Sequence, residues 1–246
     1  MTEMTTLSTP SLKLPAGWLG VIGGMGPLAA SDFLRKLTLS TVAQTDQQHI
    51  PTLLYGDCTT PDRTASVLGE GPSPLAQLLA AVDFLNAAGV QVIAMPCNSA
   101  HCWHENLVER ANMPVLHIVD ASAQQVLKRN PHARVVGVLS TEGTARMGIY
   151  TQRLTALGLE PLTPSDEDFR DLVSPGIACV KAGDLEAGGA LLRQAAHRLF
   201  DRGAHSVILG CTEIPLGMTH DLETDPVRFI DSTQSLVEAT LVHLRP

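Results

Sequence analysis

The sequence predicts an α/β protein with two pseudo-symmetric lobes, each with a mainly parallel sheet flanked by helices, and with an active site in the cleft between them. Three observations predict this fold. Short apolar runs alternate with amphipathic segments, landmark residues recur in the same order in both halves, and each half places a cysteine directly after a buried run. Ligands of open parallel sheets bind beyond the carboxyl ends of the strands, so both cysteines should lie at the mouths of their lobes.

The strand signals are runs of apolar and β-branched residues bounded by glycine, proline or polar residues. They predict strands at residues 18–22, 52–55, 90–95, 114–118, 134–139, 206–209 and 227–230. Between them, apolar residues at helical spacing predict helices at 74–88, 101–110, 121–128 and 185–202. This alternation indicates βαβ units, in which neighbouring strands run parallel.

Two of the repeated landmarks are strands that lead into a turn or a helix. Residues 20–26 resemble residues 137–143, because each is an apolar strand that runs into a glycine-bearing turn. Two further apolar strands end in Asp120 and Asp231, and an acidic residue there is suited to cap the helix that follows.

The third repeated landmark is the pair of cysteines. Gly89 precedes Cys97 by eight positions, and Gly203 precedes Cys211 by the same eight. Each pair spans a helix end, a buried strand and a cysteine at the exit of the strand. Three landmarks in one order make chance similarity a poor explanation, so facing lobes should place two thiols around one cleft.

The repeats also divide the chain. The first lobe is expected at 16–117 and the second at 118–231, with a C-terminal helix at 232–246 that packs back on the first lobe. Residues 1–15 are polar and rich in threonine and serine, and they are expected to be disordered.

Composition and charge limit the classes of function. The formal charge is -8 and the basic residues are scattered, which disfavours nucleic-acid binding and leaves a small molecule as the expected partner. The N-terminus does not read as a secretory signal and the apolar stretches are too short to cross a bilayer, so we expect a cytoplasmic protein without membrane contact. The five cysteines show no paired spacing, so free thiols are expected instead of disulfides.

The residues around the two matched cysteines suit proton transfer. Cys97 is followed by the polar residues 98–99 and Cys211 by 212–213, where each strand passes into a helix. A thiol has an unperturbed pKa of about 8.5 and a helix N-terminus lowers it, so a thiolate base is accessible without a metal. Racemisation of an α-amino acid needs such a pair, because one group removes the α-proton and another returns a proton from the opposite face.

Several short motifs stand out, at Gly23–Gly–Met–Gly–Pro27, Pro61–Asp–Arg–Thr64, Pro96–Cys–Asn–Ser–Ala–His101, Val180–Lys–Ala–Gly183, Leu209–Gly–Cys–Thr–Glu–Ile–Pro215 and Asp231–Ser–Thr233. Together they resemble the aspartate/glutamate racemase family, on its aspartate racemase side, from about Leu19 to the C-terminus. The resemblance implies two pseudo-symmetric α/β lobes, catalysis without pyridoxal phosphate or another cofactor, and a homodimer. Glutamate racemases of the family usually have a histidine where this chain has Glu213, so that residue favours the aspartate branch.

The resemblance also implies a role for each residue of the site. It makes Cys97 and Cys211 the catalytic acid/base pair, and it makes Arg63 the residue that binds the side-chain carboxylate of the substrate. The contacts to the α-carboxylate are implied for Gly24, Met25, Gly26, Asn98, Ser99 and Thr212. The other substrate-binding positions are Asp62 beside the arginine, Lys181 as a second cation, Glu213, and Thr141 with Thr144 in the equivalent turn of the second lobe.

Two features bear on substrate choice. Many relatives carry threonine at the position of Ser99, and the missing methyl group widens the pocket and leaves the breadth of substrates open. The loop at 56–74 contains the expected carboxylate-binding residues Asp62 and Arg63, so we expect it to close over the substrate.

A zinc site is the competing interpretation of one cysteine. Cys97, His101 and His104 are spaced to share one helix face and could hold zinc. The second lobe offers no matching ligands, so no metal is expected. The remaining cysteines are expected to be ordinary core residues, at positions Cys58, Cys102 and Cys179.

The expected function is cofactor-independent racemisation of an acidic amino acid, with aspartate first and glutamate next. Three alternatives remain open. They are a racemase of broad specificity, a related cysteine-dependent isomerase or decarboxylase of small dicarboxylates, and a two-lobed protein that binds a small acid without chemistry.

Overall fold

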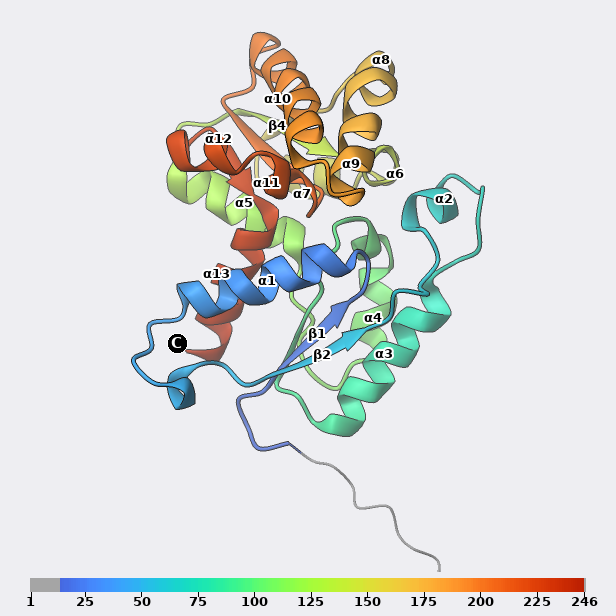
Figure 1. Cartoon of the computed structure of the whole chain (residues 1–246), viewed down its shortest axis with the longest axis vertical. Helices are drawn as coiled ribbons and strands as arrows, with labels where there is room; N and C mark the ends of the chain where they lie inside the picture. The colour runs from blue at the N-terminus through green and yellow to red at the C-terminus, as the bar shows by residue number, and fades with distance from the viewer. Residues whose placement is uncertain (1–13, 246) are drawn as a thin grey trace, which may run out of the picture.

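The computed structural model describes residues 14–245 and places two parallel sheets in two lobes (Figure 1). The expected disordered segment at 1–15 falls almost wholly outside these residues. The first sheet has the order β2-β1-β3 and is formed by β1 (Leu19–Gly23), β2 (Thr52–Gly56) and β3 (Val92–Ala94). The second has the order β5-β4-β6-β7 and is formed by β4 (Val135–Ser140), β5 (Glu160–Leu162), β6 (Ser206–Gly210) and β7 (Phe229–Asp231).

The strand orders match when β1 is aligned with β4, β2 with β5 and β3 with β6. Val115 extends the match, because it forms an isolated parallel bridge to Ile93 at the place that β7 takes beside β6. All paired strands run parallel, and helices flank both sheets. The predicted fold class of two pseudo-symmetric α/β lobes is therefore confirmed.

The helices of the first half are α1 (Pro27–Ser40), α2 (Arg63–Val67), α3 (Leu75–Ala88), α4 (His104–Arg110) and α5 (Ile118–Arg129), with 3-10 turns η1 (Asp46–Gln48) and η2 (Ser99–Trp103). Those of the second half are α6 (Glu142–Met147), α7 (Ile149–Ala156), α8 (Asp166–Asp168), α9 (Ser174–Lys181), α10 (Leu185–Asp201), α11 (Ile214–Gly217), α12 (Thr219–Thr224) and α13 (Ser232–Leu244), with a π-helical turn η3 (Phe169–Val173). The last helix, α13, packs against both α1 and α5.

The repeated glycines Gly20 and Gly137 have the same physical role. A Cβ atom at Gly20 would lie 2.8 Å from a methyl group of Val90, and one at Gly137 would lie 2.9 Å from a methyl group of Val207. Contacts this short do not occur between real side chains. Glycine at this position therefore lets the first strand of each lobe pack closely against the neighbouring valine. This supports the interpretation of the halves as repeats.

The apolar core joins the lobes as well as filling them. One buried cluster contains residues of both sheets, such as Val21 of β1 and Val136 of β4. Two further clusters belong to one lobe each, and they include Cys97 in the first and Cys211 in the second. Each cysteine is thus held by the packed core of its own lobe.

The structure corrects one predicted strand and its helix cap. The expected strand at 114–118 is reduced to the single bridge at Val115, and α5 already begins at Ile118. Asp120 therefore lies inside the first turn, where it pairs with Arg153, and His117 is the N-cap because its ring accepts the backbone N–H of Val119. The predicted cap at Asp120 is wrong.

The equivalent prediction in the second lobe is confirmed. Asp231 ends β7 and is the N-cap of α13, where its carboxylate accepts the backbone N–H groups of Thr233 and Gln234. The two halves thus differ at this landmark, since only the second has an acidic cap.

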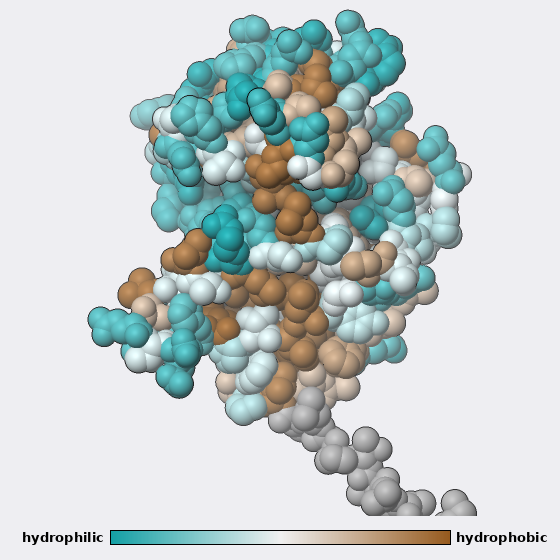
Figure 2. All heavy atoms as spheres, in the orientation of Figure 1, coloured by the Kyte–Doolittle hydropathy of each residue, from teal (hydrophilic) through white to brown (hydrophobic). Residues whose placement is uncertain are grey.

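Strand β2 forms one edge of the first sheet, and apolar side chains gather on the face of the molecule that carries it (Figure 2). Leu54 of β2 and Leu28 of α1 are among the exposed large apolar residues of the structure. Within residues 14–245 the structure has no helix long and apolar enough to cross a membrane.

Candidate active site

A small cavity between the lobes contains both matched cysteines. Its volume is about 20 Å³, which is room for about one water molecule. It is lined by Met25, Asp62, Arg63, Thr64, Cys97, Asn98, Ser99, Thr141, Lys181, Cys211, Thr212 and Glu213. All of these except Thr64 are sites that the sequence resemblance implied, and Thr64 is the last residue of the motif that contains Asp62 and Arg63.

Three of the implied residues do not line the cavity. Thr144 lies behind it, with its hydroxyl 2.8 Å from that of Ser99. Gly24 shapes the turn that follows β1, since its φ is +89° and a Cβ atom there would lie 2.5 Å from the backbone of Asp57. A Cβ atom at Gly26 would lie 3.2 Å from Oε1 of Glu213, so this glycine allows the Glu213 carboxylate to approach the turn.

Cys97 lies where β3 ends and η2 is about to begin, and it is buried. Burial raises the pKa of its thiol, while the positive charge of Arg63 and the backbone N–H of Ala100 act in the opposite direction. The first thiol is therefore placed beside groups that favour its thiolate form.

Cys211 follows β6 directly and is also buried. Its Sγ donates a hydrogen bond to Oε2 of Glu213 at 3.0 Å. Burial, followed by the negative charge of Glu213 and this hydrogen bond, holds the pKa of the Cys211 thiol well above its usual range. The two thiols occupy matched positions, and burial raises the pKa of both, but only Cys97 has the opposing charge of Arg63 among the main causes.

Arg63 is the first residue of α2, and backbone carbonyls hold one end of its guanidinium. Nη1 donates to the carbonyl oxygens of Thr60 at 3.1 Å and Pro61 at 2.8 Å, and Nη2 donates to that of Met25 at 3.4 Å. Nε is buried and has no hydrogen-bond partner among residues 14–245. The edge formed by Nε and Nη2 is therefore the part of Arg63 that can bind a carboxylate.

Lys181 is the last residue of α9 and contributes a second positive charge. It lines both the site and an adjoining cavity of about 210 Å³, which shares Asp62, Thr64 and Thr141 with the site. In the part of the chain that the structure describes, Lys181 forms no ion pair. Its ammonium group is thus placed to meet a ligand that extends from the site toward the adjoining cavity.

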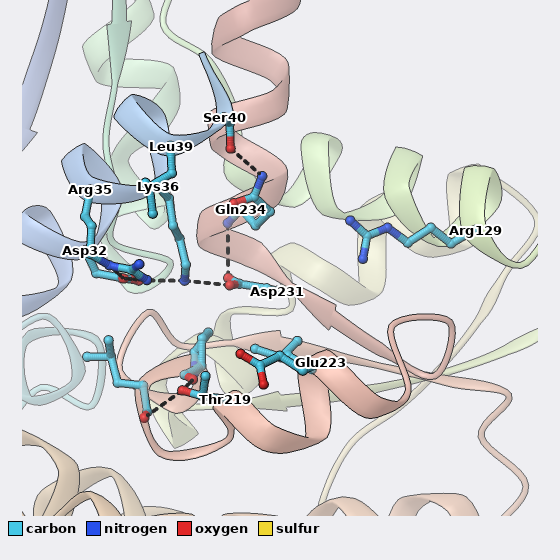
Figure 3. Close-up of a pocket in the computed structure, with 13 residues that line it drawn as sticks. Asp32, Arg35, Lys36, Leu39, Ser40, Arg129, Thr219, Glu223, Asp231 and Gln234 are labelled. Atoms are coloured by element: carbon cyan, nitrogen blue, oxygen red, sulfur yellow. Dashed lines mark hydrogen bonds and ion pairs between the residues drawn. The ribbon is translucent and has the colours of Figure 1, made fainter. Parts of the chain in front are cut away.

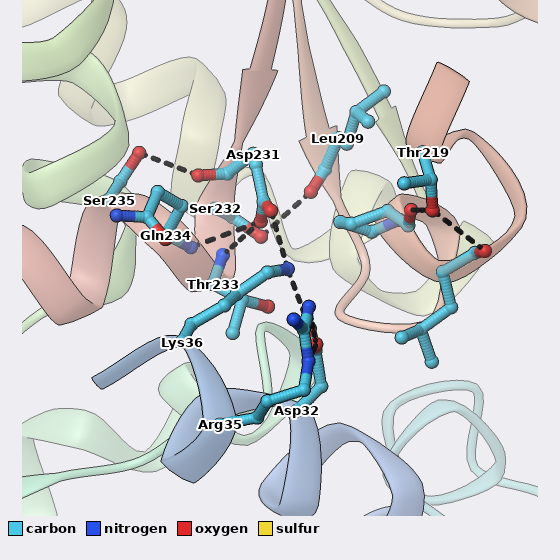
Figure 4. Close-up of polar contacts among 12 residues, drawn as sticks. Asp32, Arg35, Lys36, Leu209, Thr219, Asp231, Ser232, Thr233, Gln234 and Ser235 are labelled. Atoms are coloured by element: carbon cyan, nitrogen blue, oxygen red, sulfur yellow. Dashed lines mark hydrogen bonds and ion pairs between the residues drawn. The ribbon is translucent and has the colours of Figure 1, made fainter. Parts of the chain in front are cut away.

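Asn98 connects the lobes behind the cavity. Its Oδ1 accepts a hydrogen bond from the hydroxyl of Tyr150 at 2.6 Å, and its Nδ2 donates to Oγ of Ser232 at 3.1 Å. The Ser232 hydroxyl in turn donates to the carbonyl oxygen of Leu209 in β6, as Figure 4 shows. Only one N–H of the Asn98 amide is left for a substrate, so its side chain has a structural role as well as the implied binding role.

Lys36 of α1 reaches the start of α13 and forms a buried ion triad. Its Nζ lies 2.6 Å from Oδ2 of Asp32 and 2.6 Å from Oδ2 of Asp231 (Figure 4). Burial alone would lower the pKa of Lys36, but the charge and hydrogen bond of Asp231 raise it. The triad ties α1 to the residue that precedes Ser232.

The lid over the site is closed. The expected loop at 56–74 contains the short helix α2, which packs against α6 of the second lobe. Gly143 of α6 has no room for a side chain, because a Cβ atom there would lie 2.9 Å from Cα of Thr64. On the other side, the hydroxyls of Ser99 and Thr141 lie 3.1 Å apart. A cavity this small cannot admit an amino acid until the loop moves.

The histidines near Cys97 point toward backbone groups. Nδ1 of His101 lies 2.9 Å from the carbonyl oxygen of Cys97, and Nε2 of His104 lies 3.0 Å from that of Val115. No three His, Cys, Asp or Glu side chains of residues 14–245 converge as metal ligands. The geometry does not support the zinc interpretation of Cys97, His101 and His104.

Two larger cavities lie elsewhere. One of about 320 Å³ is lined by residues of α1, α12 and the start of α13, including Lys36, Asp231 and Glu223 (Figure 3). The other, of about 620 Å³, is lined by residues of α5 and α13 together with His104 and His117. Neither lining contains a cysteine, whereas the small cavity brings two thiols and two cations together.

Comparisons with known proteins agree with this arrangement. A family model described as Asp/Glu/Hydantoin racemase matches residues 22–240. The structure of Picrophilus torridus aspartate racemase has a TM-score of 0.81 and 28% identity, and the match covers 93% of this chain and 94% of that one. The broad specificity amino-acid racemase RacX of Bacillus subtilis is 27% identical over 227 residues, which cover 91% of this chain and 96% of that protein.

A further solved structure shows the same fold. It is an aspartate racemase homologue from Pyrococcus horikoshii, with a TM-score of 0.74 at 24% identity, and the match covers 94% of this chain and all 100% of that one. The family match extends over most of the chain, including both cysteines and the residues around them. The chain therefore belongs to the Asp/Glu/hydantoin racemase family.

Proposed function

We propose that this protein racemises an acidic amino acid, aspartate in the first place and glutamate next, with Cys97 and Cys211 as the two acid/base groups. The observation that carries the proposal is that two buried thiols, one from each lobe, line the same small cavity. A racemase needs proton carriers on opposite faces of one carbon, and two thiols on facing strand ends are suited to that task.

The difference between the thiols supports a division of labour in the free enzyme. Burial raises the pKa of both thiols, but the Arg63 charge opposes this rise at Cys97, whereas the charge and hydrogen bond of Glu213 add to it at Cys211. Cys97 is therefore the thiol that ionises more readily. The Cys97 thiolate takes the α-proton of one enantiomer, and the electron pair stays on the α-carbon and spreads into the carboxylate. Cys211 then gives its proton to the opposite face. The other enantiomer reacts with the two roles exchanged.

The charges of the cavity support an acidic substrate. The lining contains the cations Arg63 and Lys181 and two carboxylates, of which Asp62 caps α2 and Glu213 accepts the hydrogen bond of Cys211. Because the overall protein charge is -8, these local cations and not the global field must attract a dianion. The relatives similar to this chain include an aspartate racemase and a racemase of broad specificity. The second relative supports the alternative that this protein racemises a broad range of amino acids.

Chiral chromatography tests the proposal. The purified protein is incubated with each enantiomer of aspartate, glutamate and the common neutral amino acids, without added cofactor. We expect inversion of aspartate, or otherwise of glutamate. Inversion of many neutral amino acids at similar rates would favour the broad-specificity alternative. Release of carbon dioxide would favour a decarboxylase, and binding of a dicarboxylate without turnover would favour a binding protein.

Replacing Arg63 or Lys181 should lower kcat/KM for acidic amino acids more than it lowers kcat/KM for neutral ones. Hydrogen bonds to a charged partner are worth about 1.5–3 kcal/mol, so Arg63→Ala should lower kcat/KM for acidic amino acids roughly tenfold to a hundredfold. Arg63→Lys should keep part of the activity, because lysine keeps the charge and loses the planar edge. Lys181→Ala should act in the same direction but more weakly.

The measurement is kcat/KM for aspartate, glutamate and alanine in each variant. Arg170→Ala is the matched control, since Arg170 is an exposed arginine paired with Asp171. If Arg63→Ala leaves the preference for acidic over neutral amino acids unchanged, the assignment of Arg63 to the distal carboxylate is wrong.

A further inference from the structure

His101 is a buried titratable residue close to Cys97 that the proposed mechanism does not use. It lies in η2, four residues after Cys97, and only 3% of its surface is exposed. It does not line the site cavity. Its ring packs against His104 and His117, with centroids 5.7 Å and 4.7 Å away.

The contacts of the His101 ring select one tautomer. Nδ1 lies 2.9 Å from the carbonyl oxygen of Cys97, and Nε2 accepts the backbone N–H of Ile118 at 3.2 Å. With the proton on Nδ1, both partners are satisfied. With the proton on Nε2, the ring could reach only the carbonyl of Leu116, at 3.4 Å, and would turn a lone pair toward the Cys97 oxygen. The Nδ1–H form is therefore the one that fits.

This tautomer joins the catalytic turn to the start of α5. The Cys97 carbonyl belongs to the peptide between Cys97 and Asn98, so a hydrogen bond to it fixes the plane of the turn from which the thiol projects. Ile118 is the first residue of α5, which packs against α7 and α13. Burial lowers the pKa of His101 to about 3, so the ring stays neutral in the pH range where thiols ionise.

We propose that His101 is a positioning residue for Cys97: its Nδ1–H holds the Cys97 carbonyl while its Nε2 anchors the ring to the start of α5. The inference rests on the proposed function, because it assigns His101 to the proton transfer made by one of the two cysteines. Cys211 has no such partner at the equivalent position, which is occupied by Pro215. The loss of His101 should therefore slow the proton transfer on only one face of the substrate, the face that Cys97 serves.

Two amide replacements separate the two hydrogen bonds of the ring. In His101→Asn, the side-chain amide takes the place of Nδ1, so it keeps the donor to Cys97 and loses the acceptor for Ile118. In His101→Gln, the amide takes the place of Nε2, so it keeps the acceptor and loses the donor. His104→Gln is the matched control, because His104 packs on the same ring but bonds to Val115 and not to Cys97.

The readouts are kcat in both directions, the melting temperature, and the kinetic isotope effect of α-deuterated substrate for each enantiomer. A misplacement of about 1 Å can cost about 10²-fold, so we expect His101→Gln to lower kcat by about that factor. Its isotope effect should rise for the one enantiomer whose α-proton goes to Cys97 and should not rise for the other. His101→Asn should keep most of kcat even though it melts at a lower temperature.

A purely structural role predicts a different pattern. Activity would then follow the melting temperature in all variants, and the isotope effects of both enantiomers would stay at their wild-type values. That result, or full kcat in His101→Gln, would overturn the inference. If the wild-type protein itself inverts no amino acid, the proposed function fails instead, and the two failures are thus distinguishable.

Discussion

Cys97→Ala and Cys211→Ala should each abolish racemisation, because each change removes the proton carrier on one face of the substrate. A positioned acid or base contributes about 10²–10⁴-fold, and within residues 14–245 no third thiol lines the cavity. The expected loss is therefore at least about 10²-fold in kcat for each variant. The measurement is the rate of inversion of aspartate from both enantiomers.

The matched control is Cys58→Ala, since Cys58 is an exposed free cysteine outside the cavity and not the core residue that the sequence predicted. It should keep wild-type activity. The single variants should also differ from each other in exchange on prolonged incubation in heavy water, when the remaining thiol has time to exchange its proton with solvent. It can then label only one enantiomer, and a different one in each variant. A loss below tenfold in either Cys97→Ala or Cys211→Ala would contradict the assignment of two bases.

Lys36→Met should cause the largest loss of stability among single changes around the site. Lys36, Asp32 and Asp231 have side-chain exposures of 14%, 4% and 7%, so removing the ammonium group leaves the buried Asp231 carboxylate without a cation and leaves Asp32 with the more exposed Arg35 alone. Breaking a buried ion pair from one side costs about 3–5 kcal/mol of unfolding free energy. The measurement is urea unfolding of wild type and variant at neutral pH.

Arg110→Met provides the matched comparison for Lys36→Met. Arg110 pairs with Asp83, but both side chains are about half exposed, so solvent replaces the lost partner and stability should hardly change. Equal losses in the two variants would show that the Lys36 triad has no special importance. A loss confined to Lys36→Met would support its role in joining α1 to the cap of α13.

The position of the two cysteines could be predicted because it depends on local order. Each follows a buried strand after a glycine eight positions earlier, and parallel strands place such residues at the same edge of a sheet. The same reasoning failed at Asp120, because the strand before it is only a single bridge and α5 begins early, at Ile118. A short strand gives too few residues for the pattern to fix its end.

The partners of the site residues could not be predicted in the same way. Lys36 and Asp231 are 195 positions apart, and Asn98 and Tyr150 are 52 apart, so no local pattern connects them. His101 lies in a recognised motif, but the sequence does not show which atoms its ring contacts. The tautomer that donates to the Cys97 carbonyl follows only from the contact of Nε2 with the backbone N–H of Ile118. Ser232 likewise stood in a motif, and its bond to Asn98 depends on the packing of the two lobes.

Racemisation in heavy water tests the two-base mechanism most directly. L-aspartate is incubated with the enzyme in deuterium oxide, and both enantiomers are analysed for α-deuterium at low conversion. Two thiols on opposite faces predict that the D-aspartate formed carries one deuterium while the remaining L-aspartate is unlabelled, because the thiol that took the α-proton returns it and the opposite thiol delivers one from solvent. Deuterium entering both enantiomers at equal rates, or D-aspartate formed without deuterium, would contradict the mechanism.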